Sequence, residues 1–236
     1  NAAPVLAAIP DQTLTEGQTL SLTLSATDSD IPSQTLTFSL ITGPDGMAVS
    51  AAGALTWTPT ETQGPSTNAV TVAVSDGVAS ASRSFTVFVR EVNAAPALAA
   101  IPDQTLTEGQ TLSLTLSATD TDLPAQTLTF SLTSGPDGMA VSAAGVLTWT
   151  PTEAQGPGSH PVTVAVSDGL TSVSRSFTVT VNEVNAAPVL AVIANQTLDE
   201  GQTLNLTLSA TDSDLPAQSL TFSLTSGPDG MAVSAA

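Results

Sequence analysis

The chain has 236 residues with 21 acidic side chains, 3 basic ones, no Lys and a formal net charge of −18. Such a surface repels phosphate backbones and anionic headgroups, which argues against nucleic acid as a partner and against membrane insertion. No Cys is present, so disulfides and thiolate metal sites are excluded, and no apolar run approaches the roughly 20 residues of a membrane-spanning helix.

The first 92 residues consist of short alternating segments separated by turns. Residues 5–9 form an apolar run that Pro10 closes. Between residues 20 and 26, Leu alternates with Ser and Thr, which is the period of two expected of a half-buried strand. No stretch shows a helical period over a useful length. The same alternation returns at residues 36–40, 55–58, 70–74 and 85–89.

Composition and spacing together predict the architecture. Thr, Val, Ser and Leu dominate the segments, and β-branched residues favour a pleated sheet. Short strands at regular intervals with polar turns are typical of an antiparallel sandwich. We therefore predict an all-β protein built from seven-stranded antiparallel Greek-key β-sandwiches. Trp57 alternates in phase with Leu55, so we expect it in the core.

The chain repeats itself with a period of 92 residues, marked by Asn1, Asn93 and Asn185. The second copy differs from the first at 17 of 92 positions. One difference replaces Phe88 by Thr180, which predicts an outward position on the last strand. The predicted domains are 1–92, 93–184 and, as a partial copy, 185–236.

The third copy contains counterparts of the first strands only. It lacks the counterparts of residues 55–57, 70–74 and 85–89. Half a sandwich would expose its apolar face and unpaired strand edges. We therefore expect the chain to be part of a longer, elongated array of repeats. The alternative is that a neighbouring molecule supplies the missing strands by strand addition.

Consecutive copies meet at a short seam without a spacer. It reads Glu-Val-Asn-Ala-Ala-Pro at residues 91–96 and again at 183–188, and its second half stands at residues 1–4. The rigidity of each joint therefore depends on groups at the seam itself.

Each full copy carries eight acidic residues. Asp11 and Asp45 follow Pro in turns, where Asp is common. The other six lie at strand ends or in loops. Since successive strands of a sandwich run in opposite directions, these ends gather at two poles, where carboxylates can bind Ca²⁺, which takes about 6–8 oxygens at roughly 2.3–2.6 Å. In the first copy the six are Glu16, Asp28, Asp30, Glu61, Asp76 and Glu91.

Five short motifs recur in a fixed order. Residues 26–30 read Ala-Thr-Asp-Ser-Asp, and residues 74–77 read Val-Ser-Asp-Gly. Glu16 comes early, Glu61 follows Trp-Thr-Pro-Thr, and residues 89–96 read Val-Arg-Glu-Val-Asn-Ala-Ala-Pro. Over the whole chain this order resembles that of bacterial cadherin-like repeats, which stand in tandem in large secreted RTX-type adhesins. The family's motifs at these places are Ala-x-Asp-x-Asp, Ala-x-Asp-x-Gly, Pro-Glu, Asp-Arg-Glu and Asp-x-Asn-Asp-Asn-x-Pro.

The resemblance implies seven-stranded Ig-like sandwiches with Ca²⁺ held between consecutive repeats. For the first joint it implies the upstream ligands Glu16, Glu61, Glu91 and Asn93 and the downstream ligands Asp120, Asp122 and Asp168. For the second joint it implies Glu108, Glu153, Glu183 and Asn185 with Asp212 and Asp214, and a last ligand beyond the end of the chain. Facing a repeat before residue 1 would be Asp28, Asp30 and Asp76.

The chain departs from the cadherin pattern at two places. Ala94 and Ala95 stand where cadherins carry Asp-Asn, and Glu61 lacks the neighbouring Asp. Both changes remove oxygens, so we expect fewer or weaker ions at each joint. An affinity of roughly 10⁻⁴–10⁻³ M would suffice outside a cell. The alternative is that the carboxylates only solvate acidic turns.

Nothing in the sequence assembles a catalytic site, and we predict that the chain is not an enzyme. His160 is the only His and lies in a predicted loop rich in Gly, Pro and Ser, where we expect it to be exposed. No Ser/His/Asp set, Gly-rich phosphate loop or Cys/His metal set can be formed. Arg83 and Arg175 are expected on the solvated face, paired with a carboxylate.

These expectations combine into a structural role. We predict calcium-stiffened spacer repeats of an extracellular bacterial adhesin that mediates surface attachment or biofilm formation. The partners would be neighbouring repeats, with any glycan or cell-surface ligand bound by a region outside this chain. A self-assembling subunit of a filament or coat is the first alternative. A glycan-binding module ranks third, because only 2 Trp and 6 Phe are present and most alternate inward.

Overall fold

A computed structural model describes residues 1–234 of the chain. By their contacts these residues form two compact units. The first unit comprises Asn1–Ala97 together with Thr119–Leu128 and Ser167–Ser172, so it holds the first repeat and two loops of the second. The second unit comprises Leu98–Ala118, Thr129–Val166 and the described residues from Val173 onward.

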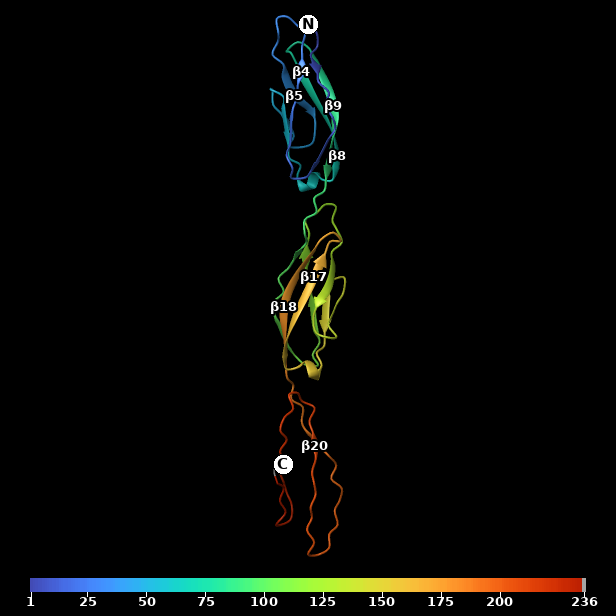
Figure 1. The fold of residues 1–236 in the computed structure, drawn as a ribbon, viewed down its shortest axis with the longest axis vertical. Helices are drawn as coiled ribbons and strands as arrows, with labels where there is room; N and C mark the ends of the chain where they lie inside the picture. The colour runs from blue at the N-terminus through green and yellow to red at the C-terminus, as the bar shows by residue number, and fades with distance from the viewer. Residues whose placement is uncertain (235–236) are drawn as a thin grey trace. The chain divides into compact units, whose positions relative to one another are not determined.

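The first repeat is a β-sandwich, drawn in blue to green in Figure 1. Alternating apolar and polar side chains explain why these segments form strands, since each strand buries one face. Its strands are β1 (Val5–Leu6), β2 (Gln12–Thr15), β3 (Leu20–Thr23), β4 (Ala26–Thr27), β5 (Thr37–Thr42), β6 (Ala48–Val49), β7 (Ala54–Trp57), β8 (Ser66–Ser75) and β9 (Ser80–Arg90), with a 3₁₀ turn η1 (Glu61–Gln63).

Two main sheets make up the sandwich. One has the strand order β2-β9-β8-β5 and the other β3-β7-β6, with the short pair β1-β4 beside them. The chain leaves the β1 pair at Pro10 and joins the larger sheet as β2. Asp11 Oδ1 accepts a hydrogen bond from the Thr86 main-chain N–H at 2.7 Å, which holds the segment between β1 and β2 against β9. The parallel pairing of β2 with β9 places Leu14 opposite Val89.

The predicted strands are present, with differences at the short ones. The alternation missed β2, which has a single apolar residue, Leu14, and it missed the two-residue β6. The expected strand over residues 20–26 is divided into β3 and β4, and the one over 5–9 ends at Leu6. Pairing is antiparallel except between β2 and β9.

The core of the first sandwich contains Trp57, as predicted, at 2% exposure. The indole Nε1 donates to the Asp45 carbonyl oxygen at 3.1 Å, so its polar atom is satisfied. Phe88, at 40% exposure, points outward between buried Val87 and Val89, which confirms its predicted orientation. Fully buried around the indole are Leu55, Val70, Val72, Val74 and Val87.

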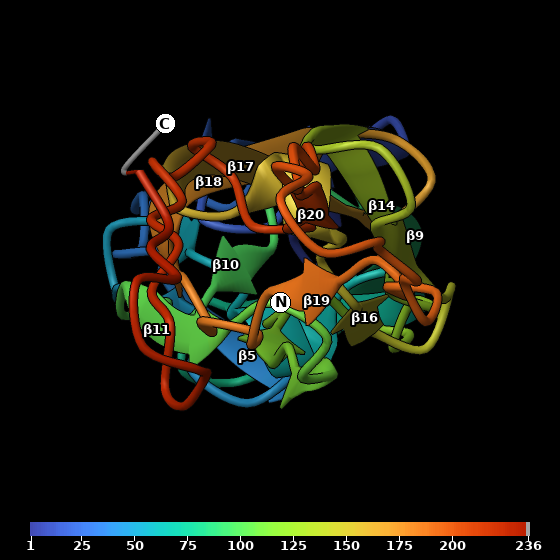
Figure 2. The ribbon, with the colours of Figure 1, turned by 90° about the horizontal axis from the view of Figure 1, so that it is seen from below.

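The second repeat has the same strand order. Its four-stranded sheet is β11-β18-β17-β14, and Figure 2 shows β17 and β18 next to each other. Trp149 is its buried indole, at 1% exposure. The strands are β10 (Ala97–Leu98), β11 (Gln104–Thr107), β12 (Leu112–Thr115), β13 (Ala118–Thr119), β14 (Thr129–Ser134), β15 (Ala140–Val141), β16 (Val146–Trp149), β17 (Gly158–Ser167) and β18 (Ser172–Asn182), with η2 (Glu153–Gln155).

Residues 185–234 contain one strand pair, β19 (Val189–Leu190) with β20 (Ala210–Thr211). This pair corresponds to β1-β4 of the first repeat. The counterparts of β2, β3 and β5 pair elsewhere with β9, β7 and β8, and residues 185–234 include no copies of those partners. Apolar side chains of this segment are accordingly exposed, Val192 at 99% and Ile193 at 48%.

Two side-chain predictions were wrong. His160 lies in strand β17 rather than in a loop, and it is partly buried because its ring packs edge-on against Trp149 with centroids 5.1 Å apart. Its Nε2 also lies 2.7 Å from the Gln155 carbonyl oxygen. Arg83 and Arg175 are exposed, but each donates its Nε–H to a main-chain carbonyl oxygen, of Leu6 and Leu98 respectively, rather than to a carboxylate.

Within residues 1–234, none of the helices is long and apolar enough to cross a bilayer.

Candidate cation site

Three glutamates converge at one end of the first sandwich. Glu16 follows β2, Glu61 opens η1 and Glu91 follows β9. Because β2 and β9 are parallel neighbours, their C-terminal ends lie side by side at the same end of the sheet, which brings Glu16 and Glu91 together. Carboxylate oxygens of all three residues lie within 4.8 Å of one another. We call these three residues the glutamate cluster of the first joint.

Three of the six carboxylate oxygens of this cluster are buried without a hydrogen bond. Glu16 Oε1 accepts the Val92 N–H at 2.9 Å, while Glu16 Oε2 and both oxygens of Glu91 are buried and unpaired. Burying an unpaired carboxylate oxygen is costly. Like charges this close also repel one another, by on the order of 3 kcal/mol per pair at an effective dielectric constant of about 20. The cluster therefore needs a positive charge among its oxygens.

Three aspartates form a second cluster in the same compact unit. Asp120 and Asp122 follow β13, and Asp168 occupies the turn between β17 and β18. Oxygens of the three lie within 4.8 Å of one another, and Asp122 is 2% exposed. The Asp122 N–H donates to Asp120 Oδ1 at 3.1 Å, which leaves Asp120 Oδ2 buried and unpaired. We call these residues the aspartate cluster of the first joint.

Hydrogen bonds of the seam join the two clusters. The Ala94 N–H lies 3.0 and 3.1 Å from the two carboxylate oxygens of Asp122. Asn93 Nδ2 donates to Asp168 Oδ2 at 3.0 Å, and the Leu123 N–H donates to Glu61 Oε1 at 2.9 Å. The structure thus brings the seven residues expected at the first joint close together, although the Glu91 carboxylate itself makes no hydrogen bond.

Two residues of this network were missed by the sequence reasoning. Gln126 Nε2 donates to Asn93 Oδ1 at 2.8 Å, and its own Oε1 is buried and unpaired, so it offers a further oxygen. A Gln stands at this position in every copy, as Gln34 and Gln218, and that recurrence was an available signal. Thr171 donates its hydroxyl to Asp168 Oδ2 at 2.8 Å, and no signal pointed to it.

A glycine leaves room for the glutamate cluster. A Cβ added to Gly64 would lie 2.3 Å from Glu16 Oε2, and one added to Gly156 would lie 2.3 Å from Glu108 Oε2. Any larger residue would therefore push the carboxylate out of the cluster. Both glycines precede Pro, so their sequence context alone indicates only a turn.

The second joint repeats the arrangement within the second compact unit. Glu108, Glu153 and Glu183 have oxygens within 4.8 Å of one another. Glu108 Oε1 accepts the Val184 N–H, Glu153 Oε1 accepts the Leu215 N–H, and Glu108 Oε2 is buried and unpaired, as are both Glu183 oxygens.

The downstream side of the second joint is held by the same contacts as in the first. The Ala186 N–H lies 3.0 and 3.1 Å from the oxygens of Asp214, and Asp212 Oδ1 accepts the Asp214 N–H. Asn185 Oδ1 accepts a hydrogen bond from Gln218 Nε2 at 3.0 Å. Both expected aspartates therefore lie at the seam.

Asp28, Asp30 and Asp76 are the counterparts of the aspartate cluster in the first repeat, and their oxygens lie within 4.8 Å of one another. Asn1 Nδ2 donates to Asp30 Oδ2 at 2.6 Å, while Asp28 Oδ2 and Asp76 Oδ2 are buried and unpaired. These residues are together as expected.

The pKa values separate the glutamates from the aspartates. Burial, reinforced by Glu16 and Glu61, raises the pKa of Glu91 to about 7, and burial also raises the pKa of Glu183. Hydrogen bonds from main-chain N–H groups, Thr171 and Ala79 foremost, lower the pKa of Asp168 and Asp76. Asp168 and Asp76 are therefore charged at neutral pH, whereas Glu91, with a pKa of about 7, is only partly ionised there.

The raised pKa of Glu91 makes the stability of the folded state depend on pH. The folded state holds this proton more tightly than the unfolded state, whose pKa is near 4.5. Without a cation, the contribution of Glu91 to the free energy of unfolding is therefore greatest at low pH and falls as pH rises from 4.5 to about 7.

Chemically, the donor set fits one class of metal. Every candidate ligand is a carboxylate or amide oxygen, which suits hard cations and argues against zinc and copper. Each joint offers enough oxygens for the 6–8 that Ca²⁺ takes, at variable geometry, whereas Mg²⁺ demands a near-ideal octahedron. The buried oxygens that lack hydrogen-bond donors are therefore suitable ligands for Ca²⁺.

The sequence profile of the He_PIG family, described as "Putative Ig domain", matches residues 3–90 and 95–182. The chain belongs to this family. The prediction of tandem Ig-like β-sandwich repeats is thereby confirmed. He_PIG repeats account for most of the chain, and the two matched segments coincide with the two sandwiches.

A curated relative of these He_PIG repeats is chitinase A of Pseudoalteromonas piscicida, 31% identical over 193 residues. The match covers 78% of this chain and 22% of the chitinase. The chain therefore spans about a fifth of that enzyme's length.

Solved structures that match this chain include cadherin fragments and an endo-fucoidan hydrolase. Human protocadherin-24 EC1-2 is 17% identical, with a TM-score of 0.48, covering 77% of this chain and 99% of that one. Drosophila N-cadherin EC1-4 is 17% identical, with a TM-score of 0.40, covering 92% and 60%. The endo-fucoidan hydrolase MfFcnA4 is 22% identical, with a TM-score of 0.32, covering 76% and 29%.

Proposed function

We propose that each seam is a Ca²⁺-dependent joint between consecutive Ig-like repeats. The observation that carries this proposal is the set of buried carboxylate oxygens without partners, among them Glu16 Oε2 and both oxygens of Glu91. Hydrogen-bond donors of the chain hold one oxygen of Glu16, Asp120 and Asp28 and leave the other free. A divalent cation satisfies the free oxygens and removes the repulsion between their charges.

The proposed ligands fall into two groups at the first joint. Glu16, Glu61 and Glu91 hold a cation from the upstream side, and Asp120, Asp122 and Asp168 hold one from the downstream side. Asn93 and Gln126 lie between them and contribute amide oxygens. At the second joint the corresponding residues are Glu108, Glu153, Glu183, Asn185, Asp212, Asp214 and Gln218.

In this role the chain is a structural element. The repeats 1–92, 93–184 and 185–236 act as spacer domains whose joints lose flexibility when Ca²⁺ binds. We place them outside the cell, in a bacterial adhesin that attaches cells to surfaces, where Ca²⁺ in the millimolar range fills sites of roughly 10⁻⁴–10⁻³ M affinity. Their partners are neighbouring repeats, and they do not catalyse a reaction, as is usual for Ig-like domains.

Thermal unfolding tests the proposal. At a free Ca²⁺ concentration about 100 times the dissociation constant, binding to the folded state adds about 2.7 kcal/mol. For a chain of this size that raises the unfolding midpoint of the full chain by about 5–10 °C over its value in chelator. Mg²⁺ at the same concentration is the control and should give a much smaller shift. Equal midpoints in Ca²⁺ and chelator would reduce the clusters to solvated acidic turns.

The match to chitinase A favours a second candidate. Since the match covers only 22% of that enzyme, the chain can equally serve as a non-catalytic spacer within a secreted polysaccharide-degrading enzyme. The cation-dependent joints are common to both roles. Sequencing the gene on both sides of this segment distinguishes them, because a glycosidase domain in the same reading frame supports the enzyme spacer and further repeats support the adhesin.

A further inference from the structure

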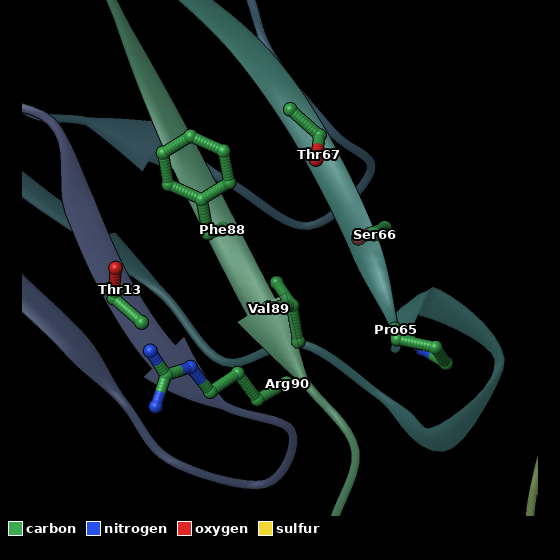
Figure 3. A pocket seen from close by; sticks show the side chains of 7 residues that line it. All are labelled: Thr13, Pro65, Ser66, Thr67, Phe88, Val89 and Arg90. Carbon is green, nitrogen blue, oxygen red and sulfur yellow. The ribbon is translucent and has the colours of Figure 1, made fainter.

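A hollow of about 520 Å³ lies on the outward face of the four-stranded sheet of the first sandwich. Thr13, Phe88 and Thr67 form one row across three adjacent strands, because Phe88 pairs with Thr13 on β2 and with Thr67 on β8. Figure 3 shows the phenyl ring of Phe88 on this face, with Thr13 and Thr67 to either side. Arg90, two residues farther along β9, lines the same hollow.

The chemistry of this face differs from the rest of the surface. The phenyl ring is 40% exposed, whereas its neighbours Val87 and Val89 are buried. Arg90 is exposed and is one of only three basic residues in a chain of net charge −18. An apolar ring, flanking hydroxyls and one guanidinium thus line one open hollow on this face.

The second repeat provides an internal comparison. Four of the seven positions that line the hollow differ between the copies, although the copies differ at only 17 of 92 positions overall. Phe88 is replaced by Thr180 and Arg90 by Asn182, so the ring and the charge are both lost. The first repeat therefore carries a surface that the fold itself does not require.

We propose that this hollow binds a sugar unit bearing an anionic group, a carboxylate or a sulfate. The flat C–H face of a sugar ring stacks on Phe88, its hydroxyls bond to Thr13 and Thr67, and the anion pairs with the fork of Arg90 N–H donors. An acidic peptide fits less well. β9 and β8 are inner strands of the sheet, so their main-chain groups are already paired and cannot bind a peptide by strand addition.

The net charge of the chain limits the ligand further. A densely charged polymer is repelled by the −18 surface, whereas a single anion pairs directly with the Arg90 guanidinium, although Glu91 of the glutamate cluster follows Arg90 in the chain. At about 0.15 M salt the screening length is roughly 8 Å, so distant carboxylates act weakly on a ligand at this site. The proposal predicts binding of short, sparsely charged sugars and goes beyond the proposed joint function.

Saturation-transfer NMR on the full chain in chelator tests the proposal without involving the cation sites. The probes are galacturonic acid, galactose 6-sulfate, neutral galactotriose and the peptide Gly-Asp-Gly. We expect transfer to one or both anionic sugars, and the sugar that binds identifies the anion.

Two variants test the roles of the charge and the ring. Arg90→Asn should weaken the binding of the anionic sugars about tenfold, the loss expected for a charged hydrogen bond. Phe88→Thr should weaken the binding of every sugar probe. Both variants install residues that the second repeat carries at these positions, so the fold tolerates them.

A gain of binding is the stricter test. The four changes Gly158→Ser, Ser159→Thr, Thr180→Phe and Asn182→Arg give the second repeat the face of the first, and should double the number of bound sugars. Binding of galactotriose or Gly-Asp-Gly as tight as that of the anionic sugars would overturn the proposal. So would binding that Phe88→Thr and Arg90→Asn leave unchanged, or the absence of transfer to any probe.

Discussion

Removing one charge from each glutamate cluster should stabilise the protein without Ca²⁺ and destabilise it with Ca²⁺. The variant is Glu91→Gln with Glu183→Gln. In chelator at pH about 7.5 its unfolding midpoint should exceed that of the wild type, by about 2–4 °C for each kcal/mol of repulsion removed. The reason is that both Glu91 oxygens are buried against two other carboxylates, so the charged form is penalised.

In saturating Ca²⁺ the order of the midpoints should reverse. Gln supplies one neutral oxygen where Glu supplied two charged ones, which should weaken Ca²⁺ binding at least about tenfold. The control is Asp199→Asn with Asp229→Asn, which removes two exposed charges away from the clusters and should leave both midpoints unchanged. A variant that is less stable than the wild type in both conditions would show that Glu91 and Glu183 act through packing rather than through charge.

Adding one methyl group to Gly64 and Gly156 should separate folding from binding. In Gly64→Ala with Gly156→Ala, each new Cβ would lie 2.3 Å from a glutamate oxygen, so Glu16 and Glu108 must swing away. The end of a flexible side chain moves at little cost. Gly64 already has φ −113° and ψ 155°, which Ala adopts without strain. Stability in chelator should therefore change little, because Ala restricts the unfolded chain while Val181 Cγ1, 3.1 Å from the Gly156 Cβ, must give way slightly.

Calcium binding by this variant should fall at least about tenfold in isothermal titration calorimetry, because each joint loses a carboxylate. Thr62→Ala is the matched control, as it changes the same 3₁₀ turn and the second repeat already has Ala154 at that position. Wild-type affinity in the glycine variant would mean that Glu16 and Glu108 do not hold the ion.

The strands could be predicted wherever alternation extended over at least four residues. The segments that became β7, β8 and β9 were found in this way, and Trp57 was placed in the core from its phase with Leu55. The strand β2 could not be predicted from alternation, because Leu14 is its single apolar residue. The position of β2 depends on its pairing with β9. Tertiary pairing, rather than local pattern, decides such short strands.

For the candidate site, the sequence identified residue types and strand ends but not contacts. Strand ends were expected to gather at two poles, and the resemblance to cadherin-like repeats assigned Glu16, Glu61 and Glu91 to the same joint. The role of Gln126 depends on which atoms lie within hydrogen-bonding distance of Asn93, and that information appears only in three dimensions. His160 shows the opposite error, since its partner Trp149 lies on another strand and a Gly- and Ser-rich neighbourhood suggested a loop.

The most direct test of the cation-dependent joint is a crystal structure of the chain grown in Ca²⁺, with anomalous diffraction measured at a long wavelength. The account predicts strong anomalous peaks within about 2.3–2.6 Å of oxygens of the glutamate and aspartate clusters, including both Glu91 and Asp120. Well-ordered clusters that hold only water, with no anomalous signal at either seam, would contradict it.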